Sequence, residues 1–134
     1  MRAYIFGGLV ASLVLLAAGP LAAHHSFSAE FDSAKPITIT GVVTKVEWTN
    51  PHVWFYLNVK NESGATENWG FEMGGPNALR TSGWTRETMK IGDEVIVEGS
   101  PAKNGSKNVN AKNVTMASTG KRLGAASSQG TEER

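Results

Sequence analysis

Cysteine is absent from all 134 residues of the chain. Its absence excludes disulfide bonds, thiolate metal ligands and thiol chemistry, so an apolar core and backbone pairing must stabilise the fold. The chain also has almost no excess of either sign of charge, because 13 Lys and Arg stand against 12 Asp and Glu. A chain this balanced has no basic excess with which to hold a phosphate backbone, and we expect no nucleic-acid partner.

Motifs of common enzyme chemistry are missing as well. The sequence contains no Gly-x-Ser-x-Gly elbow, no phosphate-binding loop and no dinucleotide fingerprint. Its carboxylates, among them Glu47, Glu72 and Glu98, are spread along expected strands and turns, and no pattern places two of them side by side. We therefore expect a protein that is not an enzyme and has no catalytic residues.

The longest apolar run extends only from Ala3 to Ala18, which is shorter than the roughly 20 residues needed to span a bilayer. A short positive start precedes it, and a Gly-Pro break and small residues ending at Ala23 follow. This order predicts a secretory signal peptide over residues 1–23, cleaved after Ala23 and leaving no stable membrane anchor. An uncleaved anchor is the alternative. The remaining residues 24–134 have the length of one small domain.

Alternating patterns predict five strands, over residues 37–48, 52–60, 65–73, 94–100 and 108–117. The first is long and changes phase once, with Gly41 at the change, which indicates a β-bulge or a sharp bend. Residues 76–80 predict a short helix with Pro76 in its first turn. Residues 85–89 predict a second helical turn with Thr85 as its N-cap.

The order of strand, strand, strand, short helix, strand and strand is that of an OB-fold. We therefore expect an all-β, five-stranded, OB-like closed barrel over residues 37–117, with a short helix between its third and fourth strands. An open antiparallel sandwich is the competing fold. Before the barrel, residues 24–36 form a polar lead-in that carries Phe27 and Phe31. After it, residues 118–134 lack periodicity and predict a disordered segment.

Short motifs follow one another in a distinctive order: HHSF from His24, VEWTNPHVW from Val46, NWGFEMG from Asn68, then Gly83-Trp84 and Gly92-Asp93. In this order they resemble a family of small exported Gram-negative bacterial proteins of unknown function, over about residues 24–116. The resemblance implies a periplasmic setting and a single small β-domain. It implies no activity and no catalytic residues.

The three histidines are candidate metal ligands. His24 and His25 would stand at the new amino terminus, and His52 opens the second expected strand. Neutral imidazoles bind copper, zinc or nickel, and the amine freed by cleavage is a further nitrogen ligand. These residues therefore indicate a possible copper site. The alternative is adventitious binding by a flexible terminus, with His52 bonded to a turn.

Aromatic side chains indicate a second candidate site. On the second expected strand, Trp54 and Tyr56 point away from the apolar face of Val53, Phe55 and Leu57, onto the side of the barrel that OB-folds use for ligands. Such rings can stack on a sugar, a base or a peptide side chain. We expect a ligand site formed by Trp48, Trp54, Tyr56, Glu72 and Trp84. The alternative is a second small core, in which residues 24–36 or 76–89 cover these rings.

Two functions are consistent with these patterns. The first is a non-enzymatic periplasmic binding or accessory module, whose partner is an unknown small ligand or a periplasmic protein. The second is a periplasmic metal-binding protein of the copper type that uses His24, His25 and His52.

Overall fold

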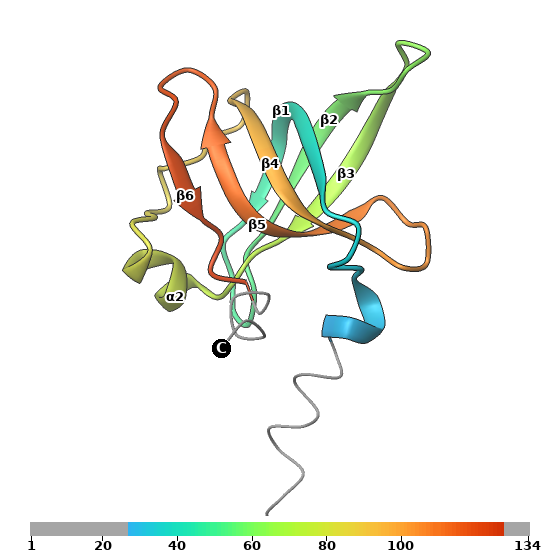
Figure 1. Cartoon of the computed structure of the whole chain (residues 1–134). Coiled ribbons are helices and arrows are strands. Elements are labelled where there is room, and N and C mark those ends of the chain that lie inside the picture. Colours follow the sequence, from blue (N-terminus) through green and yellow to red (C-terminus); the bar gives the residue numbers. More distant parts are fainter. Residues whose placement is uncertain (1–26, 128–134) are drawn as a thin grey trace, which may run out of the picture.

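Six strands and the helix α2 follow one another along residues 27–127, the part of the chain that the computed structural model describes (Figure 1). A helical turn over residues 27–30 precedes them. The five predicted strands and the predicted helix lie within two residues of their expected bounds. In chain order the elements are β1 (Ile37–Glu47), β2 (Trp54–Lys60), β3 (Thr66–Glu72), α2 (Pro76–Thr81), β4 (Glu94–Pro101), β5 (Asn108–Met116) and β6 (Arg122–Gly124).

The first five strands close into a barrel. β1 pairs antiparallel with both β2 and β4, β2 pairs with β3, and β4 pairs with β5. A parallel pairing of Gly70–Glu72 in β3 with Asn108–Asn110 in β5 completes the circle. With α2 between β3 and β4, this is the OB-type closed barrel that the sequence predicts, and the open sandwich is excluded.

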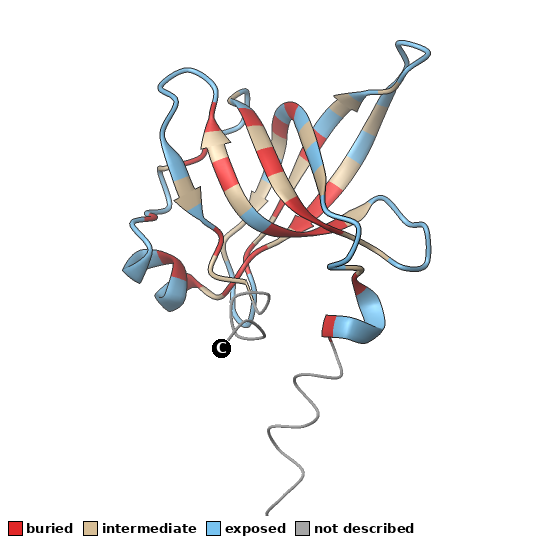
Figure 2. Cartoon of the chain, in the orientation of Figure 1, coloured by how far each residue is buried: buried red, intermediate tan, exposed pale blue. Residues whose placement is uncertain are grey.

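The core lies inside this barrel, where buried residues alternate with more exposed ones along β2 and most of β4 (Figure 2). Phe55 of β2 and Phe71 of β3 stack there, with ring centroids 5.0 Å apart and ring planes 8° apart. Leu57 and Val114 are fully buried around them. Burial of each such side chain contributes about 1.5–3 kcal/mol, and this core replaces the disulfides that the chain lacks.

β1 is the long bent strand that the sequence predicts, but the phase of its side chains changes later than expected. Gly41 lies where the strand turns from β4 to β2, and a Cβ there would come within 2.7 Å of the Asn58 carbonyl oxygen. The bulge itself falls between Val43 and Lys45. Val43 is therefore buried, whereas Val42 is 40% exposed.

Residues 85–89 form a turn and not the predicted helical turn. The Thr85 N–H donates to the Thr88 Oγ1 at 2.8 Å, and the Thr88 N–H donates to the Thr85 carbonyl at 3.2 Å. The threonine hydroxyl therefore competes with helical backbone bonding at this point. The following turn agrees with the sequence, because Asp93 Oδ2 accepts from the Lys90 N–H at 2.8 Å.

The prediction of disorder over residues 118–134 is wrong where the chain forms β6. Arg122–Gly124 pairs antiparallel with Asn113–Thr115 of β5. Ala125 is fully buried, and its N–H donates to the Lys112 carbonyl at 2.9 Å. The strand is only three residues long and contains one large apolar residue, Leu123, which leaves no periodic signal in the sequence. Residues 128–134 and the predicted signal peptide lie outside the described residues.

Candidate functional site

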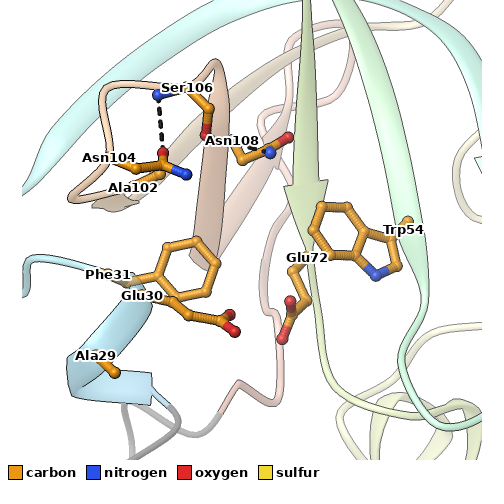
Figure 3. Close-up of a pocket in the computed structure, with 9 residues that line it drawn as sticks. All are labelled: Ala29, Glu30, Phe31, Trp54, Glu72, Ala102, Asn104, Ser106 and Asn108. Carbon is orange, nitrogen blue, oxygen red and sulfur yellow. Dashed lines mark hydrogen bonds between the residues drawn. The ribbon is translucent and has the colours of Figure 1, made fainter.

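A cavity of about 330 Å³ opens on the outer face of the barrel, where β2 begins and β3 ends (Figure 3). Trp54 and Glu72, which are cross-strand partners, form one side of it. The helical turn before β1 and the loop between β4 and β5 form the rest. The turn contributes Glu30 and Phe31, and the loop and the start of β5 contribute Asn104, Ser106 and Asn108.

Two phenylalanines hold the lead-in against the barrel. Phe27 and Phe31 are each 5% exposed, and their rings stack with centroids 5.7 Å apart. The Lys103 N–H donates to the Glu30 carbonyl at 2.8 Å, which ties this segment to the β4–β5 loop. The lead-in thus lies across the cavity from Trp54 and leaves that ring half-buried (Figure 3).

The rings of Trp54 and Tyr56 pack against β3 at Gly70, which has no side chain. Tyr56 is paired with Gly70, and a Cβ at Gly70 would come within 3.3 Å of the Tyr56 ring and 3.6 Å of the Trp54 ring. The glycine therefore lets both rings lie close to the strand. Lys45 Nζ lies 5.6 Å from the centroid of the Tyr56 ring. Trp54, and not Tyr56, is the ring of this pair that lines the cavity.

Glu72 is the most enclosed carboxylate of the site. Its side chain is 15% exposed, and its Oε1 lies 3.2 Å from Nδ1 of His52, whose side chain is 51% exposed. Burial raises the pKa of the Glu72 carboxyl above its ordinary value, His52 opposes the rise, and the charge of Glu30 adds to it. Figure 3 shows the carboxyl groups of Glu30 and Glu72 reaching toward the same space from opposite sides.

Amide and hydroxyl groups of the β4–β5 loop complete the polar part of the lining. Asn104 Oδ1 accepts from the Ser106 N–H at 2.9 Å, and Asn108 Nδ2 donates to Ser106 Oγ at 3.4 Å. The loop is closed by a bond from the Ala102 N–H to the Asn108 carbonyl at 3.0 Å. These bonds set the conformation of the loop before any ligand arrives.

Trp48 and Trp84 are not part of this cavity, although the sequence grouped them with Trp54. Trp84 is 2% exposed, and its Nε1 donates to the Gly124 carbonyl at 2.8 Å. Trp48 lines a narrow cleft beside Trp84 and Met73. Trp48 follows the bulge in β1, which changes the phase of the side chains before it. Trp84 is held beside α2 by the hydrogen bond that its backbone N–H donates to the Leu79 carbonyl at 3.0 Å.

Of the three candidate metal ligands, only His52 falls within the described residues, and it lies beside Glu72 without lining the cavity itself. His24 and His25 lie outside them. Within residues 27–127, no three His, Cys, Asp or Glu side chains are grouped closely enough to hold a metal ion.

Sequence reasoning found Trp54, Tyr56 and Glu72 on one face and offered residues 24–36 as a possible cover over these rings, but it did not identify Glu30 or the β4–β5 loop as parts of the site. Glu30 was missed because its approach to Glu72 depends on how the lead-in docks. The spacing of Phe27 and Phe31 was the available signal, since residues four apart share a helix face. The loop amides Asn104, Ser106 and Asn108 were missed because polar loop residues in a sequence mostly indicate turns.

Together these features define a small closed β-barrel of the OB type with an open, aromatic and acidic cavity on the outer face of β2 and β3. The chain belongs to a family of unknown function, DUF6152, whose family model matches residues 11–111. No curated protein matches the chain. Among the helices in residues 27–127, none has the length and apolar character to cross a membrane.

Proposed function

We propose that this protein is a non-enzymatic binding or accessory module that holds a small ligand in the cavity beside Trp54. The observation that carries the proposal is the position of that cavity. It combines the outer face of β2 and β3 with the β4–β5 loop, the same region through which OB-folds bind oligosaccharides and oligonucleotides. This last step is an analogy between folds, and the chemistry of the lining supports it independently.

The lining has the composition of a small-molecule site. A volume of about 330 Å³ is at the lower end of the range for ligand pockets. The Trp54 ring offers a face on which a ligand ring can stack, and nearby amides and carboxylates can fix the orientation of that ring. No Lys or Arg is among the lining residues, whereas Glu30 and Glu72 are. A phosphate backbone would be repelled there, so the proposal excludes nucleic acid.

The proposal includes no catalytic step. Glu72 has one carboxyl oxygen beside His52, and the side-chain amides of Asn104 and Asn108 each bond to Ser106. These groups act as acceptors and donors toward a bound ligand.

Tryptophan fluorescence tests the binding role. A library of glycans and peptides is titrated into the full chain, with far-UV circular dichroism as the check on folding. We expect at least one saturable change that is lost in Trp54→Phe and retained in Trp69→Phe, whose ring packs against the core away from the cavity. A response that survives Trp54→Phe, or the absence of any response, contradicts the proposal.

We further propose that the protein works in the periplasm after removal of residues 1–23, with no membrane anchor, where its partner is a small ligand or a periplasmic protein. The support is the order of charge, apolar run and small residues at the start of the chain. Mass spectrometry of the protein from a periplasmic fraction should find His24 as its first residue. Recovery of the full-length chain in membranes would contradict this part of the proposal.

A metal-binding role is the second candidate, and the position of His52 favours it. His52 lies 3.2 Å from Glu72, which lines the cavity, and the helical turn that contributes Glu30 to the lining begins at Phe27. In this case mature protein with its native terminus binds about one equivalent of copper and loses it in His25→Ala or His52→Ala. Copper binding that is weaker than micromolar and indifferent to His52→Ala would exclude this role.

A further inference from the structure

We infer that the ligand of this cavity is a ring-bearing primary amine, with its ammonium group between Glu30 and Glu72 and its ring against Trp54. The inference rests on the proposed binding role and names the chemical class of ligand. It starts from the shape and charge of the cavity, which offers an aromatic wall next to two carboxyl groups that reach into one space (Figure 3).

In the part of the chain that the structure describes, the lysine side chains near the cavity have partners outside its lining. Lys103 Nζ donates to the Ser28 carbonyl, outside the cavity lining. Lys107 Nζ lies 3.6 Å from Glu67 Oε1 on β3. His52 is next to Glu72 but is half exposed and does not line the cavity. Within residues 27–127 the lining contains no Lys, Arg or His, which leaves the space between the two carboxyl groups open to a cation of a ligand.

Such a cation would relieve an unfavourable arrangement of charge. Glu72 is largely enclosed and Glu30 is exposed. Burial raises the pKa of the Glu72 carboxyl, His52 opposes the rise, and repulsion by Glu30 adds to it. A bound positive charge converts repulsion into attraction, and it does so most effectively where water is partly excluded. Glu72, with a side chain that is 15% exposed, is in such a place.

The acceptor groups favour a primary ammonium over a quaternary one. A primary ammonium carries three N–H donors, and Glu30 and Glu72 provide carboxylate oxygens for short, charge-assisted hydrogen bonds. Quaternary ammonium groups have no such donors and are bound by cages of several rings. Here the lining has only two rings, Trp54 and Phe31, among nine residues.

The ring of the ligand is the second half of the inference. Trp54 lies close to the backbone of β3 at Gly70, so one side of its ring is supported by the strand. A ring held in this way gives contact area at little cost in conformational entropy. A bare metal ion would make no use of this aromatic surface. A six-membered ring with one amino group fits within about 330 Å³.

Matched pairs of probes test the inference on the full chain at neutral pH. D-glucosamine is compared with D-glucose, and 2-phenylethylamine with 2-phenylethanol, since each pair differs chiefly in the ammonium group. Calorimetry and Trp54 fluorescence measure the dissociation constants. We expect at least one amine to bind about tenfold or more tightly than its uncharged partner.

Charge-neutralising variants locate the ammonium group. Glu30→Gln and Glu72→Gln should each remove about tenfold of the preference for the amine and leave binding of the uncharged partner unchanged. Glu62→Gln is the matched control, because Glu62 is an exposed carboxylate in the loop between β2 and β3, away from the lining residues. The comparison of probes on the unmodified protein decides the question even where a variant fails to fold.

The outcomes separate this inference from the proposed function. If uncharged probes or library members quench Trp54 as well as amines do, the binding role stands and the amine assignment is wrong. If the amine preference persists undiminished in both Gln variants, the assignment to Glu30 and Glu72 is overturned. If neither the probes nor the library change the Trp54 signal, the binding role and the amine assignment both fail.

Discussion

At the scale of single residues, Glu72 links the stability of the protein to its site. Its carboxylate is largely enclosed, faces Glu30 across the cavity and is only partly compensated by His52. Carboxylates held away from water and near a like charge are typical of binding sites, where a ligand can supply the compensating positive charge. The sequence placed Glu72 on the correct face, because its parity in β3 is opposite to that of Phe71. The burial of Glu72 followed from the docked lead-in and could not be foreseen.

A pH series on Glu72→Gln tests this reading. Because the pKa of Glu72 is raised in the folded protein, the folded state binds its proton more tightly than the unfolded state does. The contribution of Glu72 to stability therefore falls as the pH rises from the ordinary pKa of a glutamate through the raised value. We expect the difference in unfolding free energy between variant and wild type to move in favour of Glu72→Gln between pH 4 and pH 7. Movement in favour of the wild type would contradict the account. Chemical denaturation at each pH provides the measurement.

At the scale of elements, the five barrel strands were predictable, whereas β6 and the position of the bulge in β1 were not. Alternation of apolar residues identified β2, where Phe55 and Leu57 are fully buried, because a strand with one buried face has a strong period of two. β6 has three residues and only one large apolar side chain, so it depends on its neighbours for its position. Gly41 marks the bend of β1, which was one of the two predicted alternatives, and the bulge follows it between Val43 and Lys45.

Trp84 connects β6 to the segment after α2, and its removal should loosen that connection. In Trp84→Phe, the Gly124 carbonyl loses the indole N–H that donates to it at 2.8 Å, and a small void replaces part of a buried ring. We expect a loss of about 1–3 kcal/mol in unfolding free energy, with faster hydrogen exchange at the Ala125 amide.

Trp69→Phe is the matched control for this change. Trp69 is partly buried, and its Nε1 donates to Glu67 Oε2 at 3.3 Å near the surface. Its replacement should cost less and leave the exchange of Ala125 unchanged. An equal cost for both variants, with no local effect at β6, would show that the Trp84–Gly124 bond does not hold the strand.

At the scale of the whole molecule, the order of elements was enough to predict the closed barrel. Closure itself depends on a contact that no local pattern reveals, the parallel pairing of β3 with β5. The cavity likewise forms only when distant segments come together, because its lining comes from the lead-in, from β2 and β3, and from the β4–β5 loop. Sequence periodicity describes one element at a time, which is why it found one side of the site and missed the other.

Gly99 tests how tightly the barrel is closed. It lies at the register shift between β4 and β5, and a Cβ there would come within 2.3 Å of the Asn110 carbonyl oxygen. Gly99→Ala should therefore destabilise the protein by about 1–3 kcal/mol or more, because backbone and not a flexible side chain must move.

Gly124→Ala is the corresponding control, because nothing lies within 4 Å of a Cβ at Gly124. Thermal unfolding should show a clear decrease in Tm for Gly99→Ala and almost none for Gly124→Ala. Equal values of Tm for the two variants would mean that β4 and β5 do not approach each other as closely as described.

Binding of a ligand in the cavity beside Trp54 underlies both proposals, and an NMR titration can detect it residue by residue. The full chain is titrated with 2-phenylethylamine and with D-glucosamine while the indole and side-chain amide signals are followed. The account predicts saturable shifts at Trp54 Nε1–H and at the side-chain amides of Asn104 and Asn108, with little change at Trp69 and Trp84. Saturable shifts centred on Trp84, or an unchanged spectrum with both compounds and with the glycan and peptide library, would contradict it.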